Sequence, residues 1–131
     1  MTAISRLLVF AAVSVLACVP AAAVRPIDAD WDEVARNRDG DCELVVTGNG
    51  RFYRIAATGL GSGESARYFL SNGTMRPIDW AVRADGSGSF ARYYLPFREN
   101  HGDSTVAISL TSASCSLSAS FPFETAKITV L

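Results

Sequence analysis

Three cysteines carry the most specific chemistry in this chain of 131 residues: Cys18, Cys42 and Cys115. Cys18 ends an uncharged apolar run near the N-terminus, whereas the other two lie in segments of alternating polarity. An even pair of thiols in an exported chain is typical of a disulfide, and both Cys42 and Cys115 fall on the apolar side of their segments. We therefore predict a Cys42–Cys115 disulfide, joining either two parallel neighbouring strands or two facing sheets. Closing this loop would contribute about 4 kcal/mol in the chain-entropy description.

The first residues are typical of a secretory signal peptide. Arg6 supplies a positive charge, residues 7–18 carry no charge, and three alanines at 21–23 follow. A charged start, an apolar run and a small-residue exit form this signal. The run is shorter than the roughly 20 apolar residues that a membrane-spanning helix needs, so we expect no transmembrane span after cleavage. Cleavage after Ala23 would release a periplasmic or secreted protein that begins at Val24.

A second interpretation of the same segment stays open. Residues 15–18 (Val-Leu-Ala-Cys) resemble a bacterial lipobox, in which Cys18 would be lipidated and become the first mature residue. An acyl chain would then hold the domain at a membrane surface without a spanning helix. This alternative predicts a membrane-anchored lipoprotein.

The other reactive side chains form no recognisable catalytic or metal-binding motif. His101 is the only histidine, and no nucleophile motif such as Gly-x-Ser-x-Gly accompanies it. The acidic residues between 28 and 41 do not form an EF-hand loop, because Glu33 occupies the position that needs glycine. The net charge of −1 gives no basic face for nucleic acid. We therefore predict a protein that is not an enzyme, with no cofactor, no metal and no nucleic-acid partner.

Arginines and tyrosines recur along the middle of the chain and could share a binding face. Both side chains are enriched at interfaces, and a guanidinium stacks on aromatic rings. Such a face would suit a protein or an anionic glycan. An ordinary solvated sheet face with tyrosines packed over it is the competing interpretation. The candidate binding residues are Arg54, Arg67, Arg92, Tyr68 and Tyr93.

The elements that would position these residues are short strands. Hydrophobic residues make up 49% of the chain and charged residues 19%, which favours a packed core. Alternating segments separated by Gly, Asn and Asp turns, with no long helical period, predict a β-sandwich of about seven strands. Pro77 places its strand at a sheet edge or bulge. The expected strands are 42–47, 51–57, 65–71, 75–84, 89–95, 105–111 and 115–123, and residues 125–131 could add a short eighth.

The chain thus divides into a signal peptide (1–23), an acidic N-terminal segment (24–41) and a β-sandwich domain (42–131). Asp30 with Glu33 three residues later matches a loose capping box, which predicts a short helix over 31–36. Trp31 in that segment must either pack against the domain or contact a partner.

The region from Arg51 to Ser112 resembles a bacterial immunoglobulin-like domain. Three pieces carry the resemblance: Ala57-Thr58-Gly59-Leu60-Gly61-Ser62-Gly63-Glu64, which is similar to a "GL-x-x-GE" corner; Ala84-Asp85-Gly86-Ser87-Gly88-Ser89-Phe90 before Leu95-Pro96, which is similar to an "AD-x-x-G-x-F" hairpin; and Gly102-Asp103-Ser104-Thr105-Val106-Ala107-Ile108, which is similar to a late "G-x-x-x-V-x-V" strand. The resemblance implies an immunoglobulin-like sandwich with a binding, adhesive or spacer role.

Three functions follow as hypotheses. The first is a non-enzymatic binding or structural module of the cell envelope, with an unknown protein or glycan as its partner. The second is a subunit of a surface polymer or pilus, assembled by pairing of edge strands. The third is an inhibitor of an extracellular hydrolase that presents the loop 98–104.

Overall fold

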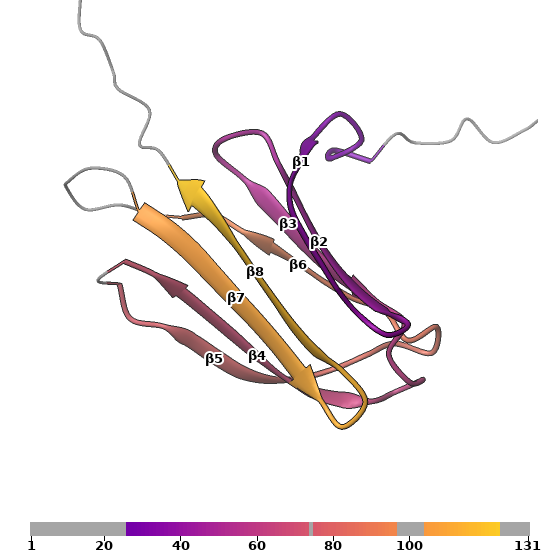
Figure 1. Ribbon diagram of the computed structural model, residues 1–131. Coiled ribbons are helices and arrows are strands. Elements are labelled where there is room, and N and C mark those ends of the chain that lie inside the picture. Colours follow the sequence, from indigo (N-terminus) through magenta and orange to yellow (C-terminus); the bar gives the residue numbers. More distant parts are fainter. Residues whose placement is uncertain (1–25, 74, 97–103, 124–131) are drawn as a thin grey trace, which may run out of the picture.

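The structure is a computed structural model that describes residues 26–73, 75–96 and 104–123 (Figure 1). These residues form eight strands in two four-stranded antiparallel sheets that face each other, so the predicted all-β sandwich is confirmed. The strands are β1 (Asp32–Asp39), β2 (Cys42–Gly48), β3 (Tyr53–Thr58), β4 (Ser65–Asn72), β5 (Ile78–Arg83), β6 (Phe90–Tyr94), β7 (Ser104–Ser112) and β8 (Ser116–Phe123).

The strands are arranged in the order β1-β2-β3-β6 in one sheet, here sheet A, and β5-β4-β7-β8 in the other, here sheet B. Short turns join β1 to β2, β2 to β3, β4 to β5 and β7 to β8 within a sheet. The chain changes sheet after β3, β5 and β6. β5 is an edge strand and follows Pro77 directly, as that proline predicted.

The acidic N-terminal segment forms a strand, and the expected helix over 31–36 is wrong. β1 pairs with β2 from Asp32↔Gly48 to Asp39↔Cys42, around a tight turn in which Gly40 has a φ of 59°. Backbone pairing therefore replaces the marginal two-turn helix that the capping pattern favoured. The sandwich begins at β1 rather than at Cys42, and its eighth strand is β1. Residues 125–131, the expected short eighth strand, lie outside the described residues.

The core lies between the sheets and follows the predicted alternation. Leu44, Val46 and Ile55 of sheet A are fully buried against sheet B. Along β7, Val106, Ile108 and Leu110 point inward, as expected. The alternation of 89–95 was ambiguous from sequence. The structure resolves it, because Phe90 and Arg92 lie opposite the buried residues Ala57 and Ile55 of β3. Ala91 and Tyr93, which alternate with them, therefore belong to the outer face.

The predicted disulfide is confirmed, and it joins facing sheets rather than parallel neighbours. Cys42 begins β2 in sheet A, and Cys115 immediately precedes β8 in sheet B. Their Cα atoms are 6.3 Å apart although 73 positions separate them in sequence. The bond ties the two sheets together at one end of the sandwich.

Two glycine-rich segments pack against each other at this end of the molecule. The corner 59–64 and residues 84–89 share three backbone hydrogen bonds: Leu60 N to Gly88 O, Gly63 N to Asp85 O, and Ala84 N to Glu64 O. A Cβ at Gly88 would lie 1.9 Å from the carbonyl oxygen of Leu60, so the contact requires glycine. The turn 85–89 is a crossing between sheets, because β5 and β6 belong to different sheets. The expectation of a hairpin there is therefore wrong.

The two lateral sides of the sandwich differ. On the first, here the closed side, β1 and β8 lie against each other. The Ser116 amide donates to Asp39 Oδ2 at 2.7 Å, and the Ser118 amide donates to Asn37 Oδ1 at 3.0 Å. On the second, here the open side, β5 and β6 are the sheet edges, and the Arg92 guanidinium lies 5.3 Å from the Trp80 ring centroid.

Candidate interaction surface

The five residues expected to share a binding face lie in four different places, so a single face is the wrong arrangement. Arg54 and Tyr93 are direct cross-strand neighbours on the outer face of sheet A. Arg67 lies on the outer face of sheet B. Arg92 sits at the open side, and Tyr68 is 2% exposed, inside the core. The sequence could not assign these faces, because the alternation of β6 was ambiguous. Tyr68 lies on the inward face of β4 and is therefore a core residue.

The outer face of sheet A carries a group of aromatic residues, here the aromatic cluster: Trp31, Phe52 and Tyr93. The Trp31 ring lies 6.5 Å from Phe52 in a near-parallel arrangement and 6.0 Å from Tyr93 edge-to-face. Both arrangements are favourable for aromatic pairs. Phe52 is nonetheless 43% exposed and Tyr93 58% exposed. The cluster is therefore held together by its own contacts while it presents apolar surface to solvent.

Local turns position Trp31 and Phe52. Residues 26–31 turn back through hydrogen bonds from Ala29 N to Pro26 O and from Trp31 N to Asp28 O. The Asn49 side chain accepts from the Phe52 amide at 2.8 Å, an Asx-type turn that fixes the residue before β3. The two rings thus meet although they come from segments that precede β1 and β3.

A charged pair borders the aromatic cluster. Arg54 Nε lies 3.2 Å from Asp28 Oδ2, and the Asp28 side chain is only 14% exposed. Arg54 is the cross-strand neighbour of Tyr93. The pair therefore fastens the N-terminal turn to β3 and adds a polar margin to an otherwise apolar surface.

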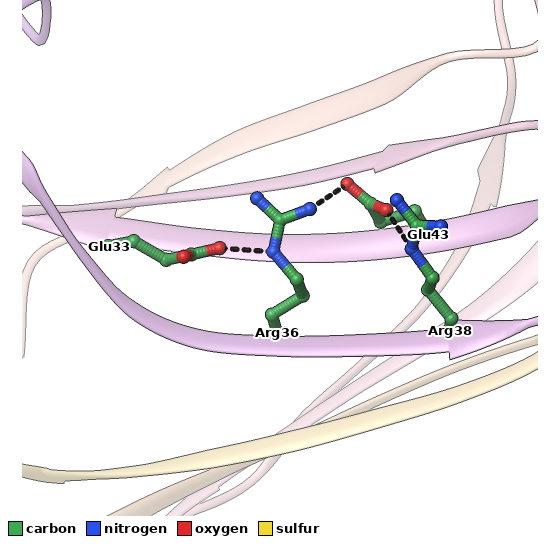
Figure 2. Close-up of polar contacts among 4 residues, drawn as sticks. All are labelled: Glu33, Arg36, Arg38 and Glu43. Atoms are coloured by element: carbon green, nitrogen blue, oxygen red, sulfur yellow. Dashed lines mark hydrogen bonds and ion pairs between the residues drawn. The ribbon is translucent and has the colours of Figure 1, made fainter.

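Further along the same face, the charges neutralise one another. Figure 2 shows Arg36 of β1 between Glu33 and Glu43, with Arg38 on the second oxygen of Glu43. The hydrogen bond from Arg36 to Glu33 raises the pKa of the arginine. These contacts join β1 to β2 rather than leaving a charge for a ligand.

The outer face of sheet B is different in composition. Arg67 and Asp79 form a two-point pair at 2.8 and 2.6 Å, which lowers the pKa of Asp79. Most other outward residues on β7 and β8 are small, with Thr105, Ala107, Thr111, Ser116, Ser118 and Ser120 exposed. Phe69 of β4 is half-buried on this face, and the described residues form no aromatic cluster there like the one on sheet A.

Two carboxylates with shifted pKa values are engaged in turn structure. Glu64 accepts from the Gly61 amide, which contributes most to its lowered pKa, and from the Ser114 hydroxyl and amide. Asp85 Oδ1 accepts from the Ser87 hydroxyl and from the amides of Ser87 and Ser89, and its pKa is also lowered. Both carboxylates stay ionised and hold neighbouring loops, which is a structural role.

Sequence reasoning named Tyr93 and Arg54 but did not place Phe52 in a site, and Trp31 was left with an unassigned contact. The signal for Phe52 was its position next to the Gly48-Asn49-Gly50 turn, which sets it outside the alternation of β3. Cys18, residues 1–23, His101 and the loop 98–103 lie outside the described residues.

Comparison with known proteins gave no match, whether to a family model, to a curated protein or to a solved structure. Within residues 26–73, 75–96 and 104–123, no helix is long and apolar enough to cross a membrane.

Proposed function

We propose that this protein is an exported, non-enzymatic binding module of the cell envelope, with an immunoglobulin-like β-sandwich fold. The observation that carries the proposal is the aromatic cluster with its Arg54–Asp28 border. Trp, Tyr and Arg are the residues that most often supply binding energy at protein interfaces. An exposed aromatic group rimmed by polar residues marks an interaction surface.

The order of the strands supports the immunoglobulin-like part of this proposal. When β2 to β8 are labelled A to G, the sheets read A-B-E and D-C-F-G. Immunoglobulin constant-type domains have A-B-E-D and C-F-G, so the two arrangements differ only in the sheet that strand D joins. The quoted corner and turn also pack together at one end. The departures are the added strand β1 and a disulfide near the starts of strands A and G instead of between B and F.

The disulfide and the signal-like N-terminus together support export. Disulfides persist in oxidising compartments such as the periplasm and the cell exterior. A soluble periplasmic or secreted form and a lipoprotein anchored through Cys18 are both compatible with this support. Intact mass of the protein from its native envelope fraction separates them: a mass beginning at Val24 indicates the soluble form, and a diacylated Cys18 indicates the anchored form.

The test of the binding role compares two sets of variants on opposite faces. Immobilised wild-type protein would be presented with pooled envelope proteins and, separately, with cell-wall glycans. Trp31→Ala/Tyr93→Ala should weaken retention of the bound component by about tenfold or more. The matched control, Arg67→Ala/Asp79→Ala on sheet B, should bind like wild type. The opposite pattern, with binding lost only in the control, would move the site to sheet B and contradict the proposal.

The surface-polymer alternative requires two complementary free edges. Side-chain hydrogen bonds from Asn37 and Asp39 occupy part of the β8 edge, and β1, the other edge on that side, has a bulge between Glu33 and Ala35. Among the described strands, β5 and β6 are therefore the better edges for pairing. Isologous pairing, in which two copies use this same side, forms a closed dimer rather than a chain. The binding module is therefore the better-supported proposal.

A further inference from the structure

We propose that the open side binds an extended peptide segment with acidic side chains, which pairs with β6 as an added strand. The open side adjoins the aromatic cluster through Tyr93 of β6, and variants of its own distinguish it from that cluster. The expected partner has an extended backbone, with a carboxylate on one face and apolar side chains on the other.

A groove between the two edge strands provides the space. It is lined by residues from the end of β5, the following turn and β6, among them Val82, Arg83, Asp85, Phe90, Ala91 and Arg92. Phe90 is buried, and Ala91 and Arg92 are exposed. The groove thus combines the apolar side chains of Val82 and Phe90 with an arginine on each of its strands and with Asp85 between them.

The backbone of β6 can accept another strand. β6 pairs with β3 along one edge, and in the described part of the chain no strand pairs with its other edge. Natural edge strands are usually protected by prolines, bulges or capping contacts. β8 has such protection through Pro122 and the contacts from Asn37 and Asp39, and β1 has a bulge between Glu33 and Ala35. The five residues of β6 contain no proline, and their pairing with β3 shows no bulge.

The charges of the groove specify an acidic partner. Neither Arg83 nor Arg92 forms an ion pair within the described residues. The Arg92 guanidinium instead lies over the rings of Trp80 and Phe90, at 5.3 and 5.9 Å. The nearby Asp85 directs Oδ1 into its own turn. Asp85 lines the same groove, and Arg83 Nη1 donates to the Gly63 carbonyl at 3.5 Å. A carboxylate from a partner would therefore pair with Arg92, which forms no ion pair within the described residues.

The alternation of β6 defines the spacing of the partner's side chains. Arg92 lies on the inner side of the strand, and Tyr93 lies on the outer face. Side chains of an added strand alternate in the same way. Residues facing the groove would meet Arg92, and the intervening residues would lie beside Tyr93. The expected segment therefore has Asp or Glu at the groove-facing position beside Arg92, with apolar or β-branched residues on either side of it.

The experiment uses a phage-displayed library of random 12-residue peptides against the full mature protein. We expect the selected sequences to be enriched in Asp and Glu, with an acidic residue flanked by apolar or β-branched residues. A synthetic peptide of the selected sequence should bind Arg92→Glu about tenfold more weakly than wild type. Arg51→Glu, an exposed arginine in the turn between β2 and β3, is the matched control and should retain binding.

Two further measurements test strand addition itself. Only every second amide of an added strand donates to β6, so N-methylation of one alternate set of peptide amides should abolish binding while the other set is tolerated. Amide exchange of residues 90–94 should slow in the complex. The proposal is overturned by a library that returns no binder, by binders without acidic enrichment, or by equal tolerance of both N-methylated sets. Binding of polygalacturonate in the absence of peptide binding would overturn it in favour of an anionic glycan.

Discussion

The closed and open sides of the sandwich are built from edge strands in opposite ways. On the closed side, side chains of β1 satisfy backbone amides of β8, and the disulfide joins β2 to the residue before β8. On the open side, side chains of the described residues join the sheets: Arg92 lies over Trp80, and the Asn72 amide donates to Tyr94 Oη at 3.1 Å. One side is therefore sealed through its backbone, while the other keeps backbone groups available. The closed side therefore has contacts that occupy backbone groups of an edge strand, and the open side is where we propose that a strand is added.

Removing the disulfide is the strongest way to weaken the closed side. Cys42→Ala/Cys115→Ala should lower the free energy of unfolding by about 2–5 kcal/mol, because the unfolded chain regains the entropy of a long loop. Urea unfolding of the variant and of wild type measures the loss. Reduced and alkylated wild-type protein is the control and should be destabilised in the same direction. Equal stability of oxidised and reduced protein would mean that the side-chain contacts alone seal this side.

The open side has its own buried link between the sheets. Asn72 in β4 is 3% exposed and is hydrogen-bonded to Tyr94 in β6. Asn72→Ala should cost about 1–3 kcal/mol, since a buried polar partner is lost and the Tyr94 hydroxyl loses its donor. Tyr94→Phe should cost less, about 0.5–1.5 kcal/mol. Thermal unfolding of both variants checks the order. An Asn72→Ala variant as stable as wild type would mean that aromatic contacts, rather than this hydrogen bond, hold the sheets together on the open side.

The side chains of Asn37 and Asp39 cover the edge of β8, and removing one of them tests whether the closed side protects that edge. Asn37→Ala should lower stability by about 0.5–1.5 kcal/mol and expose the Ser118 amide. Hydrogen exchange at that amide should accelerate, and self-association should rise with concentration because a second edge becomes available. Asp39→Asn keeps an acceptor for Ser116 and is the matched control. Unchanged exchange at Ser118 in Asn37→Ala would show that the cap does not protect the edge.

The smallest expected effect is the pH dependence of stability that comes from Glu64 and Asp85, which hold the turns at the disulfide end of the sandwich. The lowered pKa values of Glu64 and Asp85 mean that the folded state binds protons less readily than the unfolded state. Their contribution to the free energy of unfolding is fully present at pH values above the ordinary carboxyl pKa values of 4.5 and 3.8. It is lost as the pH falls through the lowered pKa values of the folded state. The melting temperature should therefore fall on acidification below about pH 4.5. Glu64→Gln should flatten this slope, and an unchanged slope would assign it to other carboxylates.

The turn residues made much of the fold predictable. Gly and Asn between alternating segments located seven of the strands, and the parity of the mature cysteines predicted the disulfide. β1 was missed because only Ala35 and Asn37 are partly buried and Asn37 is polar, so the strand has almost no apolar alternation to detect. The Asp39-Gly40 pair before β2 was the available signal, since Asp-Gly is a hairpin turn. The aromatic cluster could not be derived, because its three rings converge only once the N-terminal turn and two neighbouring strands are in place.

The contact between β1 and β8 also affects the order of events during biosynthesis. These are the first and last strands of the described fold, and Asn37 reaches Ser118 across most of the chain. Such long-range contacts form late, because the intervening chain must be ordered first. A nascent chain that has not yet exposed residues 115–118 therefore keeps a free thiol at Cys42 and an unpaired outer edge on β1. The disulfide therefore closes only after the chain has been synthesised as far as β8, when all the described strands are present.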